Sequence, residues 1–226
     1  MDFARQLTQW DMALTPEQAA LFERYYALLV SWNERFNLTT VTEREAVYAK
    51  HFADSLAGMR FMSGEVCDVG AGAGFPSLPL AIMRSDVGYT LLDSVNKKVT
   101  FLTEVIASLG LPNAKALHIR AEDAGKGAMR ETFDVVTARA VAPIDTLLEY
   151  LSPLAKVGGR VVVYKTNAEE ELARADHAAR VLRLRLREVY DYTIEEAKRC
   201  ILVFDKEAAT PRQYPRGGNK PRTMPL

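Results

Sequence analysis

The chain carries the sequence EVCDVGAGAGFP at residues 65–76, an apolar run that breaks into three glycines spaced by single alanines. The apolar run predicts a short buried strand, and glycines after a strand allow a tight turn with positive φ that a ligand can approach closely. A second apolar run, Gly88–Leu92, is followed by Asp93, roughly 20 residues beyond the glycines. An acid there can accept hydrogen bonds from ribose hydroxyls, so the pattern indicates a nucleoside-binding half of a doubly wound sheet.

Two classes of nucleoside cofactor fit this pattern. Dinucleotide-binding folds usually carry G-x-G-x-x-G, and the N-terminus of the following helix faces pyrophosphate. Here the third glycine, Gly74, comes one position early, and Pro76 follows two residues later. The G-x-G-x-G form after an acidic strand end, Asp68, is more typical of S-adenosylmethionine (SAM) sites, because SAM has no phosphate and its cationic amino-acid end favours carboxylates. The sequence therefore favours SAM, with a dinucleotide site or a purely structural glycine turn as alternatives.

The composition sets limits on the kind of protein. The 226 residues are 48% hydrophobic and 26% charged, with a formal net charge of zero. This is an ordinary globular composition, sufficient for one sizeable α/β domain and a modest appendage, and any nucleic-acid binding must come from a local patch. Cys67 and Cys200 are expected to be buried thiols, because nothing suggests secretion. With no apolar run of ~18 residues and no signal peptide, we expect a cytoplasmic protein without a membrane segment.

Residues 1–60 predict an N-terminal helical appendage. Thr15–Gln18 combines a capping threonine, a proline at the first helical position and a glutamine three residues after the threonine. A further helical segment is expected over Val47–Met59. The apolar residues after the cap recur at the spacing of one helical face: Leu21, Phe22, Tyr25, Leu28, Leu29 and Trp32.

From Glu65 onward, strand and helix patterns alternate, which predicts a parallel sheet. Five parallel strands closed by an antiparallel pair are typical of the class I SAM-dependent methyltransferase (Rossmann-like) fold, which we expect over residues 61–206. A dinucleotide fold normally ends on a sixth parallel strand. The expected strands are Glu65–Val69, Gly88–Leu92, Ala114–Ile119, Phe133–Ala138 and Gly159–Lys165, then a Leu/Arg alternation over 182–187 and Cys200–Asp205. The expected helices are Asn96–Leu109, Ile144–Leu154 and Ala168 to about Val181.

Residues 207–226 form a basic, proline-rich C-terminal tail. Its four basic residues face a single acid, Glu207: Arg212, Arg216, Lys220 and Arg222. Such a composition predicts an extended or disordered segment when free. It is either a solvated tail or a basic arm that orders on a phosphate backbone.

The residues available for catalysis limit which kinds of atom could accept the methyl group. Methylation of an exocyclic amine usually needs an Asn/Asp-Pro-Pro-aromatic turn after the fourth strand, but Thr137–Pro143 reads TARAVAP. Methylation at pyrimidine C5 needs a cysteine nucleophile, and neither cysteine lies at such a position. The three histidines show no metal-ligand spacing. An acceptor with its own lone pair, such as guanine N7, remains; it needs alignment rather than a general base, and alignment can contribute ~7–11 kcal/mol.

Several ordered motifs resemble one family, from about Leu21 to the C-terminus. The motifs are Trp32–Thr39, His51–Leu56, the glycine turn running into Phe75-Pro76, Leu91–Ser94, Asn96–Lys98, Arg120–Glu122 and Thr137–Ala140. Together they resemble the bacterial 16S rRNA guanine-N7 methyltransferases, the glucose-inhibited division protein B family. Two departures are Ser77 and Thr166, where the family commonly has glycine.

The resemblance implies roles for particular residues. The implied cofactor-binding residues are Gly70, Gly72, Phe75, Asp93 (ribose), Ala121 and Glu122 (adenine) and Arg139. Arg139 is also the implied catalytic residue, because it follows the fourth strand where the acceptor base would approach. His51 and Asp54, at i and i+3, are expected to pack or to orient the substrate, and Lys97, Lys98 and Lys165 are candidate phosphate contacts.

The resemblance also implies partners. SAM is the expected cofactor and 16S rRNA, or the small ribosomal subunit, the expected substrate, with the protein acting as a monomer. Two alternatives remain at this point. One is a SAM-dependent methyltransferase of another substrate, and the other is a non-catalytic RNA-binding factor in ribosome assembly.

Overall fold

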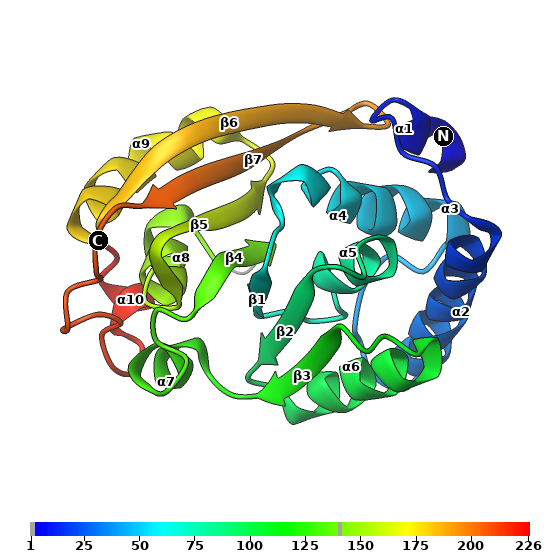
Figure 1. The fold of residues 1–226 in the computed structure, drawn as a ribbon, viewed down its shortest axis with the longest axis horizontal. Helices are drawn as coiled ribbons and strands as arrows, with labels where there is room; N and C mark the ends of the chain where they lie inside the picture. Colours follow the sequence, from blue (N-terminus) through cyan, green and yellow to red (C-terminus); the bar gives the residue numbers. More distant parts are fainter. Residues whose placement is uncertain (1–2, 140–141) are drawn as a thin grey trace.

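The computed structural model describes residues 3–139 and 142–226, and its centre is a seven-stranded sheet of order β3-β2-β1-β4-β5-β7-β6 (Figure 1). Strands β1 to β5 are mutually parallel, whereas β7 is antiparallel to both β5 and β6. The predicted class I methyltransferase sheet is thereby confirmed. The strands are β1 (Glu65–Val69), β2 (Gly88–Asp93), β3 (Ala114–His118), β4 (Phe133–Arg139), β5 (Ala155–Lys165), β6 (Leu184–Ile194) and β7 (Ala197–Lys206).

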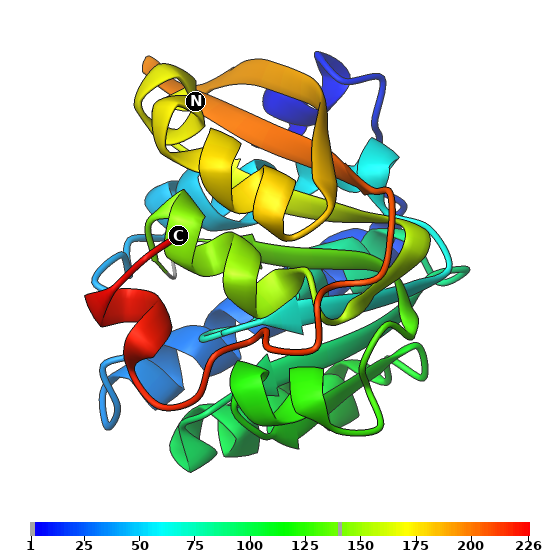
Figure 2. The ribbon, with the colours of Figure 1, turned by 90° about the vertical axis from the view of Figure 1, so that its left-hand side faces the viewer.

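Helices cover both faces of the sheet (Figures 1 and 2). The helices α7, α8 and α9 pack on one face, and the N-terminal helices pack with α5 and α6 on the other. In the described part of the chain, none of the helices combines the length and hydropathy that crossing a lipid bilayer requires. Their bounds are α1 (Phe3–Thr8), α2 (Pro16–Asn33), α3 (Arg44–Val47), η1 (Tyr48–Ala53), α4 (Asp54–Leu56), η2 (Met59–Phe61), α5 (Ser77–Met83), α6 (Asn96–Leu109), α7 (Ala121–Lys126), α8 (Ile144–Leu151), α9 (Ala168–Val181) and α10 (Lys220–Thr223).

The predicted start of α2 is confirmed as a capping box. The Thr15 hydroxyl accepts from the Gln18 amide at 3.2 Å, and the Gln18 side chain accepts from the Thr15 amide at 2.9 Å. The expected helix over Val47–Met59 is present, but its winding changes along its length. It runs from α3 through the π-helical turn η1 into α4, a local widening that sequence periodicity does not reveal.

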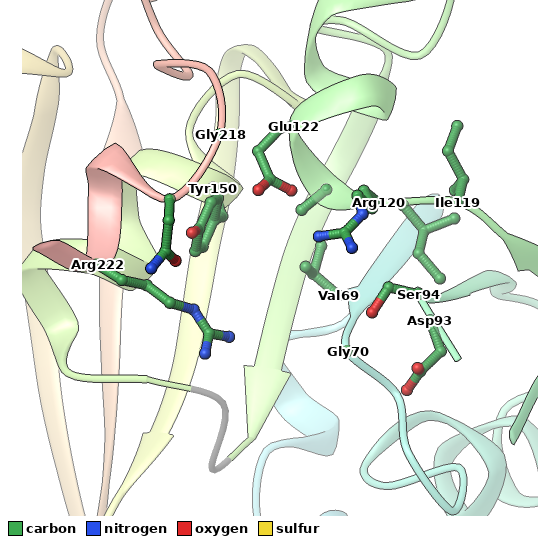
Figure 3. A pocket seen from close by; sticks show the side chains of 13 residues that line it. Val69, Gly70, Asp93, Ser94, Ile119, Arg120, Glu122, Tyr150, Gly218 and Arg222 are labelled. Atoms are coloured by element: carbon green, nitrogen blue, oxygen red, sulfur yellow. The ribbon is translucent and has the colours of Figure 1, made fainter.

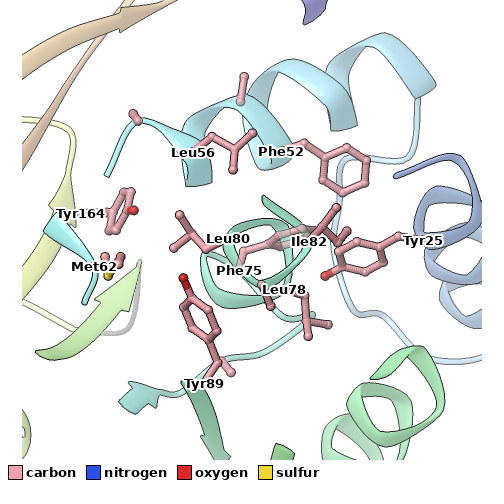
Figure 4. Packing of buried hydrophobic residues seen from close by; sticks show 14 of the residues in the cluster. Tyr25, Phe52, Leu56, Met62, Phe75, Leu78, Leu80, Ile82, Tyr89 and Tyr164 are labelled. Carbon is pink, nitrogen blue, oxygen red and sulfur yellow. The ribbon is translucent and has the colours of Figure 1, made fainter. Parts of the chain in front are cut away.

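The N-terminal helices share one hydrophobic cluster with the sheet. Phe22 and Tyr25 of α2 and Phe52 of η1 are fully buried, and Figure 4 shows Tyr25 and Phe52 beside Phe75 of the glycine turn. Their rings lie 5.2 Å (Tyr25–Phe52) and 5.7 Å (Tyr25–Phe75) apart. Each fully buried aromatic side chain contributes roughly 1.5–3 kcal/mol to stability, so residues 1–60 supply much of the core on this face.

The C-terminal tail differs from its prediction. Residues 207–226 cross the face covered by α7 and α8 and end in the short helix α10 (Figure 2). Thr210, Tyr214 and Pro221 are buried, and Arg216 forms a bidentate ion pair with Glu149, whose side chain is completely buried. The prediction of a disordered tail is therefore wrong, although most of the segment is exposed, as expected of a solvated tail. Its basic and apolar residues find partners far away in the sequence, which composition alone cannot indicate.

Candidate active site

The glycine turn after β1 is tied to the end of β2. Gly70, Gly72 and Gly74 all have positive φ, of 71°, 60° and 95°, a backbone region that favours glycine. The amides of Gly70 and Ala71 donate to the Leu92 carbonyl at 2.8 and 3.0 Å, and the Gly72 amide donates to Oδ2 of Asp93 at 2.9 Å. The turn and the acid at the end of β2 therefore form one structural unit, as the sequence pattern predicts.

Helix α2 holds this turn from behind. The Tyr25 hydroxyl donates a hydrogen bond to the Ala73 carbonyl. A Cβ on Gly74 would lie 2.5 Å from both the Tyr25 hydroxyl and a Leu78 methyl group. Gly74 is thus required twice, by its positive φ and by the close approach of α2.

A cavity of about 470 Å³ opens beside the turn at the carboxyl ends of β1, β2 and β3 (Figure 3). We call it the glycine-turn pocket. Its lining residues are Val69, Gly70, Leu92, Asp93, Ser94, Ile119, Arg120, Ala121, Glu122, Tyr150, Gly218, Asn219 and Arg222. Of the predicted cofactor residues, Gly70, Asp93, Ala121 and Glu122 line this pocket, whereas Gly72, Phe75 and Arg139 do not.

Asp93 is 5% exposed and is oriented by the backbone. Its Oδ1 accepts from the Val95 amide at 2.8 Å, Oδ2 accepts from the Gly72 amide, and the Lys98 ammonium lies 3.9 Å from Oδ2. Each carboxylate oxygen has a second lone pair. Asp93 can therefore accept hydrogen bonds from ribose hydroxyls in the pocket without giving up its own contacts.

Asp68, near the end of β1, is a buried carboxyl group. It is 1% exposed, and among the described residues neither of its oxygens makes a well-formed hydrogen bond, although the hydroxyl and amide of Ser77 are close enough to lower its pKa. Burial raises its pKa to about 7, and the nearby Ser77 offsets the rise only in part. An orphaned carboxyl group is costly unless a ligand supplies the missing charge or donor. The α-ammonium group of SAM is a ligand group of that chemistry, so the residues present fit this cofactor.

Arg139, at the end of β4, is held by three protein groups. It donates to Oδ2 of Asp54 at 2.7 Å, to the Lys50 carbonyl at 3.1 Å and to Nδ1 of His51 at 3.0 Å. Because a guanidinium only donates, the contact with Arg139 requires Nδ1 of His51 to accept; the Lys50 carbonyl, 3.1 Å from Nδ1, then receives no hydrogen bond from the ring. In this tautomer Nε2 donates to the Thr39 hydroxyl at 2.8 Å. Burial, with Arg139 adding to the effect, lowers the pKa of His51 to about 3, which keeps the ring neutral.

Phe75 connects this cluster to the glycine turn. The His51 ring stacks on Phe75 at 4.5 Å, and the Arg139 guanidinium carbon lies 5.0 Å from the Phe75 ring centre. Phe75 is itself 6% exposed. It acts as a packing surface for His51 and Arg139, whose positions are thereby fixed relative to the turn.

A second cavity, of about 440 Å³, opens at Arg139, and we call it the arginine pocket. Its lining residues are Val41, Lys50, His51, Asp54, Arg139, Tyr164, Lys165, Thr166, Glu171, Tyr192 and Arg199. Oδ1 of Asp54 accepts from the Tyr192 hydroxyl at 2.8 Å. Lys165 donates to the Ala142 carbonyl at 2.7 Å and to Glu171 at 2.9 Å. The pocket thus combines ordered donors with an excess of positive charge, because four cationic residues (Lys50, Arg139, Lys165 and Arg199) line it against two acids (Asp54 and Glu171).

Sequence reasoning missed some lining residues. Tyr192 reaches the arginine pocket from β6, and Tyr150, Asn219 and Arg222 reach the glycine-turn pocket from α8 and the tail. No local pattern marks them, because each is brought in by long-range packing. Ala140 and Val141, part of the segment considered for the methyl acceptor, lie outside the described residues.

The order of the strands, the glycine turn and the acid at the end of β2 define a class I SAM-dependent methyltransferase. Solved structures share the fold. A 16S rRNA (adenine(1408)-N(1))-methyltransferase mutant from Catenulisporales acidiphilia has a TM-score of 0.55 and 14% identity over 71% of this chain and 93% of that chain. A SAM-dependent methyltransferase from Aquifex aeolicus has a TM-score of 0.54 and 17% identity over 72% and 93%.

Sequence comparison gives the particular family. A family model described as rRNA small subunit methyltransferase G matches residues 18–199. The chain is also 44% identical over 230 residues to the ribosomal RNA small subunit methyltransferase G of Staphylococcus aureus (strain bovine RF122 / ET3-1), covering 99% of this chain and 96% of that protein. The counterpart from strain Newman is 43% identical over the same shares. The chain belongs to the rRNA small subunit methyltransferase G family.

Proposed function

We propose that the protein transfers a methyl group from SAM to N7 of a guanine in 16S rRNA, as free RNA or within the small ribosomal subunit. SAM would occupy the glycine-turn pocket, with Asp93 on the ribose, Ala121 and Glu122 at the adenine and Asp68 toward the α-ammonium group. The guanine would enter the arginine pocket. The observation that carries the proposal is Arg139, an oriented donor beside that pocket, fixed on the Phe75 ring that follows the glycine turn.

Arg139 has donors to spare for a base. A guanidinium has five N–H groups, and three of those in Arg139 are used by Asp54, His51 and the Lys50 carbonyl among the described residues. Arginine is the commonest partner of the guanine O6/N7 edge. A donor on O6 alone would orient the base and leave the N7 lone pair free to attack.

The charges around Arg139 suit the expected change in charge. SAM, when bound, supplies a methyl group on a cationic sulfur, and methylation at N7 moves that positive charge onto the guanine ring. Asp54, 2.7 Å from Arg139, neutralises the guanidinium, and His51 stays neutral. This pairing reduces the positive charge that Arg139 itself would place beside the ring that becomes cationic, although the pocket as a whole has four cations and two acids.

Chemistry at N7 also removes the need for a general base. The acceptor nitrogen carries a free lone pair and loses no proton, so alignment of the two reactants is the main task. His51, Asp54 and Phe75 position Arg139 for that task.

Three further expectations belong to this proposal. The working unit would be the monomer, and the place of action the cytoplasm. Residues 1–60 would form a helical appendage that supports the glycine turn, residues 61–206 the methyltransferase domain, and residues 207–226 a separate C-terminal segment.

The proposal is tested by methyl transfer with purified protein. Radiolabelled SAM should label 16S rRNA or the small subunit, and leave 23S rRNA unlabelled. Asp93→Ala should raise the Kd for SAM at least about tenfold, because it removes buried acceptors of the ribose. Asp86→Ala, which removes an exposed acid before β2, is the matched control and should change neither the labelling of the RNA nor the Kd for SAM. Absence of label from every ribosomal RNA would refute the proposal.

A further inference from the structure

The C-terminal segment lines the glycine-turn pocket, which its composition does not predict. Gly218, Asn219 and Arg222 belong to the lining, together with Tyr150 of α8 and Glu122 of α7. Figure 3 shows Arg222 and Tyr150 on one side of the cavity and Arg120 and Asp93 on the other. The tail is thus one wall of the pocket, although it is some 80 residues after β4 and outside the expected methyltransferase domain.

This wall is fixed from behind. Arg216 donates to Glu149 from its backbone amide at 2.7 Å and from its side chain at 2.6–3.1 Å. The buried Thr146 hydroxyl donates to the Pro221 carbonyl at 2.9 Å. Arg222 lies one residue after that anchor. Its backbone is therefore placed without help from a bound nucleic acid.

A second set of contacts fixes the start of the segment. Arg130 donates to the Thr210 carbonyl at 2.7 Å and to the Tyr214 carbonyl at 2.9 Å. The buried ammonium of Lys206 donates to the Ser152 carbonyl at 2.7 Å and to the Thr210 hydroxyl. With anchors at both ends, the segment is a preformed wall and not a free arm.

The electrostatics tie Arg222 to the same end of the pocket as Glu122. Burial raises the pKa of Tyr150; Glu122 raises it further, and the Arg222 side chain opposes the rise. The three side chains are therefore within electrostatic reach of one another. A planar guanidinium packs well on the face of a nucleobase, and an asparagine amide can pair with the edge of one.

We propose that residues 217–222 form the adenine-side wall of the SAM pocket, with Arg222 contacting the adenine ring of the cofactor. The proposal rests on the placement of SAM proposed above, in which Glu122 marks the adenine. It assigns the tail to the cofactor and not to RNA, because Arg222 lines the cavity and the segment is anchored on the protein.

The test is calorimetry on the full-length chain with SAM and with 5′-methylthioadenosine, which keeps the adenosine and lacks the amino-acid end. Arg222→Ala should raise the Kd of both ligands by about fivefold to tenfold. Arg222→Lys should keep most of this defect, because lysine keeps the charge and loses the planar face. The matched control is Arg212→Ala, an exposed arginine in the same segment that lines neither pocket; both Kd values should stay unchanged.

Two results would overturn the proposal. One is an unchanged Kd for SAM in Arg222→Ala with an unchanged melting temperature. The other is weaker binding of rRNA, with a salt slope reduced by about one, at unchanged affinity for SAM, which would make Arg222 a phosphate contact. Asp93→Ala separates the two proposals. If Asp93→Ala weakens SAM binding while Arg222→Ala does not, only the proposed role of residues 217–222 is refuted. If Asp93→Ala leaves SAM binding unchanged, the proposed placement of SAM in the glycine-turn pocket is refuted as well.

Discussion

At the residue scale, Arg139 and Asp68 are the two charged groups on which the proposed chemistry depends. Arg139 donates hydrogen bonds to Asp54 and His51, and its guanidinium lies over the Phe75 ring. Asp68 is the opposite case, a buried carboxyl group that makes no well-formed hydrogen bond within the described part of the chain. Arg139 is therefore already oriented to contact a substrate, whereas the Asp68 carboxyl group can still accept a hydrogen bond from a ligand.

Replacing Arg139 should separate turnover from cofactor binding. Arg139 lines the arginine pocket and not the glycine-turn pocket, so Arg139→Ala should lower kcat at least about 100-fold and leave the Kd for SAM within about threefold. Arg139→Lys, which keeps a cation beside Asp54, should show the same pattern with less loss of stability. Single-turnover methyl transfer and calorimetry measure the two quantities.

The control for Arg139 is Arg160→Ala, an arginine near the other end of the β4–β5 pairing. It should leave both quantities unchanged. A rise in the Kd for SAM that matches the whole loss of kcat/KM would assign Arg139 to the cofactor instead.

Asp68 should make SAM binding depend on pH. Its pKa in the folded protein is about 7, so the carboxylate that would pair with an ammonium group forms as pH rises through about 7. The affinity for SAM should therefore rise from pH 6 to pH 8, and Asp68→Asn should bind more weakly and lose this rise. Calorimetry across that range measures both.

The stability of the ligand-free protein should change in the opposite direction. Between the ordinary pKa of 3.8 and about 7, the folded state holds a proton on Asp68 that the unfolded state has lost. The contribution of Asp68 to the free energy of unfolding therefore falls as pH rises through this window. The difference in stability between Asp68→Asn and the parent should grow with pH. A difference that is constant from pH 4 to pH 8 would contradict the assignment.

At the scale of elements, the sequence predicted what local patterns encode. The alternation of apolar runs and amphipathic segments predicted β1 and α6 with their observed bounds and α9 with its observed start, and the glycines indicated the turn after β1. The contact by which helix α2 supports this turn could not be predicted from the sequence. Tyr25 reaches Ala73 from 48 residues away, and a contact of that range leaves no periodic signal. The same holds for the contact between Phe75 and Arg139, 64 residues apart in the sequence, which only the fold brings together.

The glycine turn gives a prediction with an internal control. Gly74→Ala combines positive φ with a clash against Tyr25 and Leu78, whereas Gly158→Ala has a φ of 80° but meets no atom within 4 Å. We expect about 1–2 kcal/mol of destabilisation for Gly158→Ala, and about 1–3 kcal/mol more for Gly74→Ala. Only Gly74→Ala should also weaken SAM binding. Denaturant melts and calorimetry would show this, and equal effects of the two substitutions would refute the role of α2 behind the turn.

At the scale of the whole molecule, the C-terminal tail and the glycine turn after β1, far apart in the sequence, line one pocket. The composition of residues 207–226 predicted a free segment. The neighbouring sequence does not indicate that Arg216 pairs with a buried acid, Glu149, which lies 67 residues earlier in the chain. The structure instead has a carboxylate at 0% exposure, Glu149, paired with an arginine that is 23% exposed. The basic composition of residues 207–226 therefore did not distinguish an RNA-binding arm from a segment that packs on the protein.

The Arg216–Glu149 pair predicts a large loss of stability on disruption. Arg216→Ala leaves the buried Glu149 carboxylate without its ion pair and with only the hydrogen bond from the backbone amide of residue 216, which should cost about 3–5 kcal/mol. Arg180→Ala removes an exposed i,i+4 pair with Asp176 and should cost about 0.3–0.5 kcal/mol. The double variant Arg216→Met, Glu149→Leu should recover most of the loss. Urea melts measure all three, and a cost for Arg216→Ala as small as that for Arg180→Ala would show that the tail is not held by this pair.

The most direct test of the central claim is a chemical map of the methylated base. Purified protein, SAM and small subunits lacking the modification are incubated, and the 16S rRNA is cleaved at N7-methylguanine. We predict one new cleavage site, at a guanine, which is absent when Arg139→Ala replaces the parent protein. Methyl transfer to another atom or another base, or equal transfer by Arg139→Ala, would contradict it.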